Sequence, residues 1–308
     1  MPLTSKDFDT IAKPDWCPGC GNFGIQVTIK QALANLNIEP HNVAMIAGIG
    51  CSSKMPHWID TYGLHTLHGR SLPPASGVKL ANPKLTVIIN GGDGDGYGIG
   101  MGHFVHTMRR NIDMTYMVHN NMVYGLTKGQ TTPTSMKGYK SPSTPFGAIE
   151  EPLNPIALAL TMGATFVARG YAGDVAHLTK LIEEAVKHKG FSLIDVYQPC
   201  VTFNKINTYA YFVQNSVKLN TDPVNKAATD FHDTSNWDNA MKQALRTDKL
   251  PIGIFFQTQK PTYEEQEPGM SHKGEVAPGT TPLEENLISP SELDITNIDI
   301  TKAMERYM

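Results

Sequence analysis

Strands and helices alternate along residues 40–200, and this alternation restricts the possible folds more than any other feature. The clearest strand is the apolar run 85–89, which is followed by a Gly-Asp-rich turn and a helical pattern over 98–110. Further strands are predicted at 43–49, 114–119, 165–168 and 191–197, and further helices at 22–36, 154–162 and 172–189. The pattern predicts an α/β fold with a mostly parallel sheet covered by helices on both faces.

Outside this alternation the chain carries segments without a clear periodic pattern. Residues 54–82 are rich in Gly, Pro and His, so we expect mostly loop with one short helix. Residues 127–150 are expected to form a long loop, and loops of this length are often functional. One more strand is expected at 251–257. We predict a main domain over 1–215 and a C-terminal extension over 216–308 that includes an extended arm.

Charge and hydropathy exclude several classes of function. The chain has 26 Lys+Arg against 29 Asp+Glu, a formal net charge of −3, so no basic excess favours nucleic acid or an anionic membrane surface. The apolar runs are too short to span a bilayer, and the N-terminus does not read as a secretory signal. We expect a cytoplasmic protein, in which cysteines point to metal binding or catalysis before disulfides.

Two polar motifs follow consecutive strands of the predicted sheet. Gly-Asp-Gly-Asp occupies 92–95, and Asn-Asn occupies 120–121, with Asn121 28 positions after Asp93. Because that spacing leaves room for one helix and one strand, both motifs reach the same edge of the sheet. Asp and Asn oxygens with a backbone carbonyl suit Mg²⁺ bound to a diphosphate, since phosphate and water complete its shell. The glycines let the backbone approach the diphosphate oxygens closely, and the following helix directs its N-terminal N–H groups at the diphosphate.

This pair of motifs resembles the fingerprint of thiamine-diphosphate enzymes. A dinucleotide site is disfavoured, because no Gly-x-Gly-x-x-Gly follows the first strand. The resemblance implies that Asp93 and the Asn121 side chain bind Mg²⁺ together with the Val123 backbone carbonyl. The cofactor-lining residues that it implies are Gly94, Asp95, Gly125 and Leu126.

The four cysteines of the chain form a second candidate site. Cys17 and Cys20 make a C-x-x-C pair, and Cys51 and Cys200 stand apart in the sequence. Four thiolates hold either zinc or an iron–sulfur cluster, and the residue types alone do not choose between them. A thioredoxin-type pair at the start of the helix over 22–36, or a C-x-x-C site with two unrelated buried cysteines, is an alternative.

The two sites together resemble the β subunit of the two-subunit 2-oxoacid:ferredoxin oxidoreductases. A thiamine adduct that has lost CO₂ is electron-rich, and a nearby [4Fe–4S] cluster would accept its electrons one at a time. The resemblance covers roughly residues 13–215 and rests on six motifs in order: Trp16-Cys-Pro-Gly-Cys-Gly-Asn, Gly48-Ile-Gly-Cys-Ser-Ser, Thr66-Leu-His-Gly-Arg, Gly77-Val-Lys-Leu-Ala-Asn, Gly91-Gly-Asp-Gly-Asp and Asn120-Asn-Met-Val-Tyr-Gly-Leu-Thr-Lys-Gly-Gln. It implies that Cys17, Cys20, Cys51 and Cys200 hold a [4Fe–4S] cluster.

The family resemblance also implies a reaction and partners. The reaction is the conversion of a 2-oxoacid and coenzyme A to acyl-CoA and CO₂, with electrons passed to ferredoxin. A separate α subunit, in an αβ or α₂β₂ assembly, would supply the cofactor-activating glutamate, most substrate contacts and the coenzyme A site. The chain has no C-x-x-C-x-x-C run, so we expect one cluster and an external ferredoxin. The C-terminal extension over 216–308 is expected to contact a partner subunit.

Residues near the end of the first strand and in the following loop are further candidates. Ile49, Gly50, Cys51 and Ser52 are expected to border the cofactor, because they follow the end of the first strand. By resemblance His68 contacts the diphosphate, and the alternative is a histidine hydrogen-bonded within its loop. By resemblance Lys54 faces the substrate pocket, where it would pair with the distal carboxylate of 2-oxoglutarate. That position favours 2-oxoglutarate over pyruvate or broad 2-oxoacid use.

Two rival functions fit parts of the sequence. One is a non-oxidative thiamine-diphosphate decarboxylase or synthase that carries structural zinc. The other is a non-catalytic zinc-binding scaffold that keeps the fold without a cofactor. A brown chromophore bleached by dithionite would exclude the first rival, and Mg²⁺-dependent thiamine diphosphate binding would exclude the second.

Overall fold

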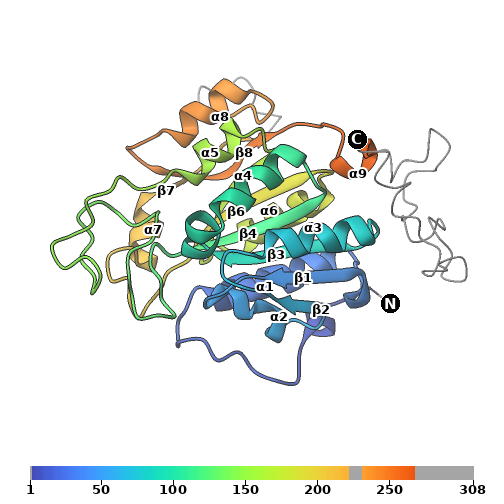
Figure 1. Cartoon of the computed structure of the whole chain (residues 1–308), viewed down its shortest axis with the longest axis horizontal. Coiled ribbons are helices and arrows are strands. Elements are labelled where there is room, and N and C mark those ends of the chain that lie inside the picture. Colours follow the sequence, from blue (N-terminus) through green and yellow to red (C-terminus); the bar gives the residue numbers. More distant parts are fainter. Residues whose placement is uncertain (1, 222–230, 268–308) are drawn as a thin grey trace, which may run out of the picture.

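A single eight-stranded sheet organises the chain (Figure 1), in a computed structural model that describes residues 2–221 and 231–267. The strand order is β2-β1-β3-β4-β6-β5-β8-β7. The strands are β1 Val43–Ala47, β2 Tyr62–His65, β3 Thr86–Gly92, β4 Met114–Asn120, β5 Phe166–Tyr171, β6 Phe191–Tyr197, β7 Ser216–Lys218 and β8 Leu250–Gln257. The first six strands in the spatial order pair in parallel, which confirms the predicted α/β class.

Helices cover both faces of the sheet (Figure 1). They are α1 Asn22–Asn35, α2 Met55–Trp58, α3 Leu72–Ala81, α4 Met101–Arg110, α5 Pro155–Thr161, α6 Val175–Lys187, α7 Tyr209–Asn215, α8 Trp237–Ala244 and α9 Tyr263–Gln266. Helices α3, α4, α5 and α8 pack into one hydrophobic core, and α1, α2 and α6 pack into the other. No helix in the described residues is long and apolar enough to cross a membrane.

Alternation along β1 shows how one strand serves two cores. Ala44 and Ile46 lie in the core with α3 and α4, whereas Val43 and Met45 lie in the core with α1 and α6. All five residues of β1 are buried. Successive side chains point to opposite faces, so a strand covered on both sides is apolar throughout. This burial explains why the apolar runs predicted the central strands well.

The two strands that follow residue 215 extend the same sheet. The strand predicted at 251–257 is confirmed as β8, which pairs antiparallel with β5, and β7 pairs in parallel with β8. Residues 216–218 and 250–257 therefore add two strands to the sheet of the main domain. Residues 268–308, the last part of the expected C-terminal arm, lie outside the described residues.

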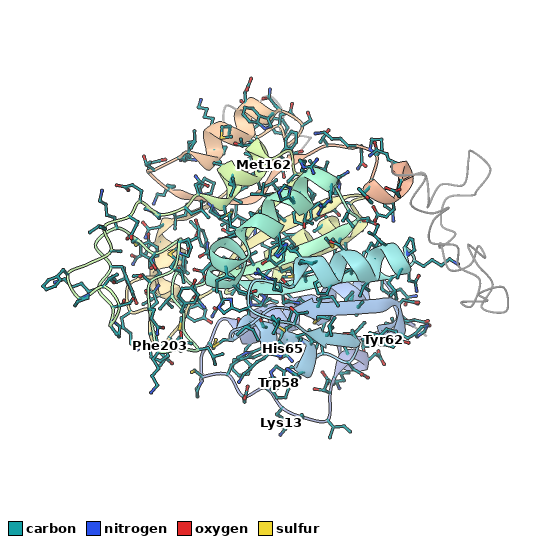
Figure 2. The ribbon with its side chains drawn as sticks, viewed as in Figure 1. Lys13, Trp58, Tyr62, His65, Met162 and Phe203 are labelled. Atoms are coloured by element: carbon teal, nitrogen blue, oxygen red, sulfur yellow. The ribbon has the colours of Figure 1, made fainter. Side chains whose placement is uncertain are left out.

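The segment 54–82 is more regular than its composition predicts. It contains β2 and the ten-residue helix α3, in place of mostly loop with one short helix. All four residues of β2 are exposed, and Tyr62 and His65 lie along the outer side of the sheet (Figure 2). An exposed edge strand has no apolar run to reveal it. Proline in the first turn of α3 costs no hydrogen bond, because those N–H groups have no partner within the helix.

The turn between β3 and α4 adopts a rare helical conformation. Residues Gly94–Ile99 form a π-helical segment that leads through Gly100 into α4, whereas the sequence predicted a helix from residue 98. A Cβ atom on Gly96 would lie 2.1 Å from the Tyr116 hydroxyl, so no side chain fits there. π-Helical turns are rare and frequently occur at functional sites.

Candidate functional site

Asp93 follows the last residue of β3 and is almost fully buried, with 1% exposure. Its Oδ1 accepts a hydrogen bond from the Asn121 backbone N–H (3.3 Å), and its Oδ2 accepts one from the Thr134 hydroxyl (2.7 Å). Burial raises the pKa of Asp93 to about 6, although these hydrogen bonds act in the opposite direction. A buried carboxylate of this kind is strongly stabilised by a nearby cation.

Asn121 follows the last residue of β4, as the spacing predicted. Its side-chain Oδ1 accepts a hydrogen bond from the Val123 N–H (3.1 Å), and its Nδ2 donates to Gln198 Oε1 (2.8 Å). Met122 has a φ of 60°, a conformation that non-glycine residues adopt rarely. This turn brings the Asn121 N–H to Asp93, and the three predicted Mg²⁺ ligands, Asp93, Asn121 and Val123, line one cavity.

Asp95 holds two loops together at the edge of the sheet. Its Oδ1 accepts hydrogen bonds from the backbone N–H groups of Ile49 (3.0 Å) and Gly69 (2.7 Å) and lies 3.0 Å from His68 Nδ1. Burial raises the pKa of Asp95, and the bonds from Gly69 and Ile49 oppose that rise. The buried Oδ2 has no hydrogen-bond partner. Asp95 therefore both lines the site and ties down the loops that carry Ile49 and His68.

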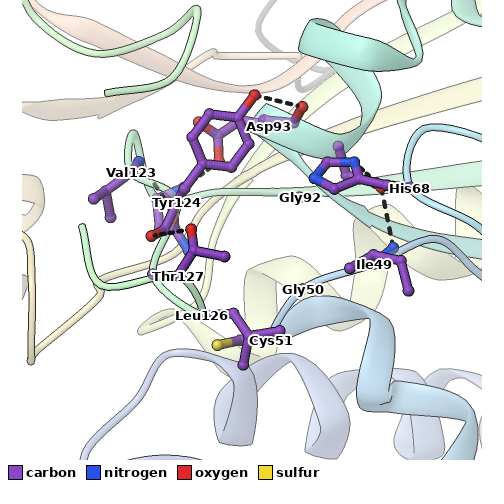
Figure 3. A pocket seen from close by; sticks show the side chains of 14 residues that line it. Ile49, Gly50, Cys51, His68, Gly92, Asp93, Val123, Tyr124, Leu126 and Thr127 are labelled. Atoms are coloured by element: carbon purple, nitrogen blue, oxygen red, sulfur yellow. Dashed lines mark hydrogen bonds and ion pairs between the residues drawn. The ribbon is translucent and has the colours of Figure 1, made fainter. Parts of the chain in front are cut away.

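A cavity of about 60 Å³ lies over these residues (Figure 3). The predicted residues that line it are Ile49, Gly50, Cys51, His68, Asp93, Gly94, Asp95, Asn121, Val123, Gly125 and Leu126. Ser52 is buried directly beside this set but does not line the cavity. The structure thus brings the predicted cofactor and Mg²⁺ residues, except Ser52, to one cavity.

The four cysteines border a second and larger cavity of about 210 Å³. Cys17 and Cys20 precede α1, Cys51 lies four residues after the end of β1, and Cys200 lies three residues after β6. The pKa of the Cys20 thiol is raised to about 12, mainly by burial and also by the other three cysteines. Burial is also the main cause that raises the pKa of Cys51, so the Cys20 and Cys51 thiols would ionise only beside a strongly positive group.

No group of three or more His, Cys, Asp or Glu side chains within residues 2–221 and 231–267 is arranged to hold a metal ion. The four cysteines instead line one cavity that has room for more than one atom.

The two cavities adjoin each other, and Cys51, Asn121, Gly125 and Leu126 line both. A Cβ atom on Gly125 would lie 3.4 Å from the Cys200 sulfur, which shows how closely this loop approaches the cysteines. The cysteine site and the Asp93 site are therefore neighbours at one edge of the sheet.

Lys54 lines the cysteine cavity and not the cavity over Asp93. Its ammonium group pairs with Asp15 Oδ2 at 2.8 Å, and the Lys54 side chain is 30% exposed. Any carboxylate that Lys54 binds at this site competes with Asp15.

Several residues of the site were not predicted from the sequence. The Tyr124 hydroxyl donates to the Gly94 carbonyl (3.0 Å), and Thr127 also lines the smaller cavity. Thr134 reaches Asp93 from the long loop, where nothing in the local sequence marks it. Gln198 had a usable signal, because it directly follows a predicted strand at the carboxyl edge of the sheet.

Comparison with known proteins agrees with this geometry. Residues 44–196 match the family described as thiamine pyrophosphate enzyme, C-terminal TPP binding domain, and residues 200–272 match the family that describes the C-terminal part of the pyruvate ferredoxin oxidoreductase β chain. The chain is 51% identical over 259 residues to the 2-oxoacid:ferredoxin oxidoreductase subunit beta of Saccharolobus solfataricus, which covers 82% of this chain and 85% of that one. The chain belongs to the 2-oxoacid:ferredoxin oxidoreductase β-subunit family.

Other members of the 2-oxoacid:ferredoxin oxidoreductases extend the comparison. The 2-oxoglutarate oxidoreductase subunit KorB of Mycobacterium tuberculosis is 44% identical over 204 residues, 66% of this chain and 55% of that protein. A solved 2-oxoglutarate:ferredoxin oxidoreductase from Magnetococcus marinus, with 2-oxoglutarate, coenzyme A and succinyl-CoA bound, matches with a TM-score of 0.84 and 40% identity. The match covers 90% of this chain and 93% of that chain.

Membership of the 2-oxoacid:ferredoxin oxidoreductases confirms the family predicted from the six motifs. It makes the protein an oxidoreductase subunit with a thiamine diphosphate-binding domain. The two rivals, a non-oxidative zinc-carrying enzyme and a scaffold without cofactor, are set aside by these matches.

Proposed function

We propose that this β subunit takes part in the coenzyme A-dependent oxidative decarboxylation of a 2-oxoacid, with electrons leaving through a [4Fe–4S] cluster to ferredoxin. The observation that carries the proposal is that the cysteine cavity and the cavity over Asp93 adjoin and share four lining residues. A redox group placed next to the reacting carbon has a short path for electrons, which a remote cysteine site would lack.

The Asp93 side of the site fits Mg²⁺ and a diphosphate. Asp93 and Asn121 would supply side-chain oxygens to the ion, and Val123 would supply its backbone carbonyl. Burial alone makes the ionised Asp93 unfavourable, and a divalent cation offsets that cost. The small cavity over these residues supports the same assignment, because Mg²⁺ leaves most of its coordination shell to phosphate and water.

Bound thiamine diphosphate would supply a carbanion that attacks the 2-oxo carbon and allows CO₂ to leave. The chain's own residues position that cofactor and restrict water around it. Asp95 holds the Ile49 and Gly69 loops in place, and the Tyr124 hydroxyl holds the Gly94 carbonyl. His68 is held by Asp95 at the rim of the cavity, where it would contact the diphosphate.

The cysteine side fits an iron–sulfur cluster better than a single ion. Four cysteines are the usual ligands of a [4Fe–4S] cluster, and each thiolate binds its own iron. The cavity of about 210 Å³ that all four cysteines line has room for a group larger than a single ion. Because its pKa is raised, ionising the Cys20 thiol costs free energy, and binding of the thiolate to iron would offset that cost.

We favour 2-oxoglutarate as substrate, with pyruvate or broad 2-oxoacid use next. Lys54 is a cation beside the shared part of the two cavities, and its partly exposed pair with Asp15 can exchange for a substrate carboxylate. Relatives named for 2-oxoglutarate, and a matched structure that holds 2-oxoglutarate and succinyl-CoA, support this choice.

The enzyme is completed by an α subunit under this proposal, in an αβ or α₂β₂ assembly. The relatives carry the name subunit beta, which implies such a partner for them. We propose that the α subunit supplies the glutamate that activates the cofactor, the coenzyme A site and most substrate contacts. The extension over 216–308 is proposed to contact a partner subunit.

Anaerobic co-expression of both subunits tests the proposal directly. The purified complex should contain four iron and four sulfide per β subunit, absorb in the visible range and bleach with dithionite. It should reduce ferredoxin with 2-oxoglutarate and coenzyme A faster than with pyruvate. A colourless, iron-free complex would overturn the redox assignment, and equal rates with all 2-oxoacids would overturn the substrate assignment.

A further inference from the structure

We propose that Gln198 is a positioning residue that connects the cysteine site to the Mg²⁺ site and raises the reduction potential of the cluster. The inference deepens the proposed function and rests on it. Gln198 directly follows β6 and is 1% exposed. Its side chain runs between Cys20 and Asn121, which belong to the two different sites.

Both ends of the Gln198 amide are engaged. Nε2 lies 3.4 Å from the Cys20 sulfur and also donates to the Pro199 carbonyl at 2.8 Å. Oε1 accepts a hydrogen bond from Asn121 Nδ2 at 2.8 Å. One side chain therefore contacts a proposed cluster ligand and a proposed Mg²⁺ ligand at the same time.

The orientation of the two amides follows from their partners. Gln198 Nε2 faces two acceptors, a sulfur and a carbonyl oxygen, so the reversed amide would place an oxygen against both. Asn121 Oδ1 accepts from the Val123 N–H, so the Asn121 NH₂ group must face Gln198. Gln198 thereby keeps the Asn121 oxygen turned away from itself and toward the Val123 N–H, in the turn whose backbone donates to Asp93.

The backbone around Gln198 is anchored on both sides. The Gln198 N–H donates to the Asn120 carbonyl (3.0 Å), and the Gly21 N–H donates to the Pro199 carbonyl (3.1 Å). A Cβ atom on Gly21 would lie 3.0 Å from Gln198 Cγ and 3.1 Å from Nε2. The residue before α1 thus packs directly on this side chain and limits its rotamers.

A hydrogen bond to a cluster sulfur has a definite effect on the redox chemistry. Reduction adds one negative charge to the cluster, and an N–H donor directed at a ligand sulfur stabilises that charge. Removal of the donor should make the reduction potential more negative. The chemical group that would tune the potential is the uncharged amide of Gln198, which contacts Cys20 and Asn121.

Two substitutions separate the two contacts of Gln198. Gln198→Met keeps the length of the side chain and removes both hydrogen bonds. Gln198→Glu keeps an acceptor for Asn121 and removes the N–H donor to Cys20. Gln31→Leu is the matched control, because Gln31 is an exposed glutamine of α1 whose side chain bonds Asn35, away from both sites.

The experiment is a dye-mediated redox titration of the anaerobic αβ complex, followed by electron paramagnetic resonance. We expect the one-electron reduction equilibrium to fall about tenfold in both Gln198 variants, a shift of about −59 mV. Isothermal titration calorimetry with Mg²⁺ and thiamine diphosphate should show about tenfold weaker binding in Gln198→Met only. Gln31→Leu should match the wild type in both measurements.

The outcomes distinguish this inference from the proposed function. A wild-type complex without a cluster would overturn the proposed function and the inference with it. A wild-type cluster whose potential stays unchanged in iron-replete Gln198→Met and Gln198→Glu would overturn the inference alone. If Gln198→Met does not fold, an unchanged potential in Gln198→Glu still overturns the inference, because that variant lacks the N–H donor and adds a negative charge that would itself lower the potential.

Discussion

Asp93 and Asp95 are both buried at the sheet edge, but different groups surround their oxygens. Asp95 is contacted on one oxygen by Ile49, Gly69 and His68, so it mainly holds loops. The oxygens of Asp93 face the Asn121 turn, where no cation stands against them within the described residues, and burial raises the pKa of Asp93 to about 6. We therefore propose that Asp93 binds the cation, whereas Asp95 anchors the two loops.

Replacement of Asp93 tests this division of roles. Asp93→Ala should abolish Mg²⁺-dependent thiamine diphosphate binding, because the buried oxygen ligand is lost while the glycine turn remains. Calorimetric titration of thiamine diphosphate with and without Mg²⁺ measures the effect. Asp60→Ala, at an exposed aspartate, is the control and should bind as the wild type does. If Asp93→Ala binds thiamine diphosphate as tightly as the wild type in the presence of Mg²⁺, Asp93 is not a ligand of the ion.

Lys54 offers a test of substrate choice. Lys54→Ile should raise KM for 2-oxoglutarate at least tenfold and leave KM for pyruvate nearly unchanged, because only 2-oxoglutarate has a distal carboxylate to pair. Asp15→Asn removes the competing carboxylate and should lower KM for 2-oxoglutarate. Steady-state kinetics of the αβ complex with both acids decide. Equal changes for the two substrates would exclude Lys54 from recognising the carboxylate.

At the scale of elements, the start of α1 determines how the cysteine pair meets the sheet. Gly24 lies in the first turn of α1, and a Cβ atom there would lie 2.3 Å from the Ala172 carbonyl. The helix therefore packs backbone to backbone against the residues that follow β5. Such close packing places Cys20 beside Gln198, which follows the neighbouring strand β6.

The close packing of α1 predicts a position-specific loss of stability. Gly24→Ala should lower the free energy of unfolding by about 1–3 kcal/mol, because either the helix or the Ala172 peptide must shift. Gly102→Ala, in α4 with open space around it, should raise that free energy by about 0.5–1 kcal/mol. Chemical denaturation of both variants measures whether each substitution lowers or raises the free energy of unfolding. A neutral Gly24→Ala would contradict the packing argument.

A buried ion pair links the central strands. Arg169 of β5 donates to Asp195 of β6 at 2.9 Å, and Asp195 also accepts from Tyr97 and Asn120 at 3.0 Å each. Asp195→Asn should lower the free energy of unfolding by about 3–5 kcal/mol, since it leaves the buried Arg169 without a counter-charge. The double variant Arg169→Met/Asp195→Asn should recover part of that loss. Additive losses in this double-mutant cycle would mean that the pair is not coupled.

For the whole molecule, the proposed cluster joins parts of the chain that are far apart in sequence. Its four cysteines come from the lead-in before α1, the loop after β1 and the segment after β6. A cluster bound to all three segments should stabilise the folded arrangement of these segments, because it binds the folded chain and not the unfolded one. Residues 9–16 carry little helix or strand and depend most on this connection.

Removal of the cluster should therefore loosen one end of the molecule first. Anaerobic treatment with an iron chelator and ferricyanide should make bonds near residues 9–16 the first to be cut by protease, at least tenfold faster than in the intact complex. Mass spectrometry of the fragments locates the cuts. Cys200→Ser without treatment should give the same fragments. Identical fragment patterns with and without the cluster would show that iron does not tie this segment down.

The sequence alone determined the fold class and most of the residues that line the cavity over Asp93. Buried parallel strands are apolar on both faces, so their runs are visible in the sequence, and the rule that ligands gather at strand ends directed attention to Asp93 and Asn121. The six ordered motifs identified the family. Strand β2 was missed, because an exposed edge strand carries no apolar pattern.

Only the tertiary structure decided which distant residues meet. The adjoining of the two cavities, the pairing of Lys54 with Asp15 and the contact of Gln198 with both Cys20 and Asn121 depend on how three strand ends and α1 pack. Local sequence restricts the backbone within one element, whereas contacts between elements depend on side-chain packing across the sheet. The periodicity or spacing within one segment therefore does not predict contacts between elements.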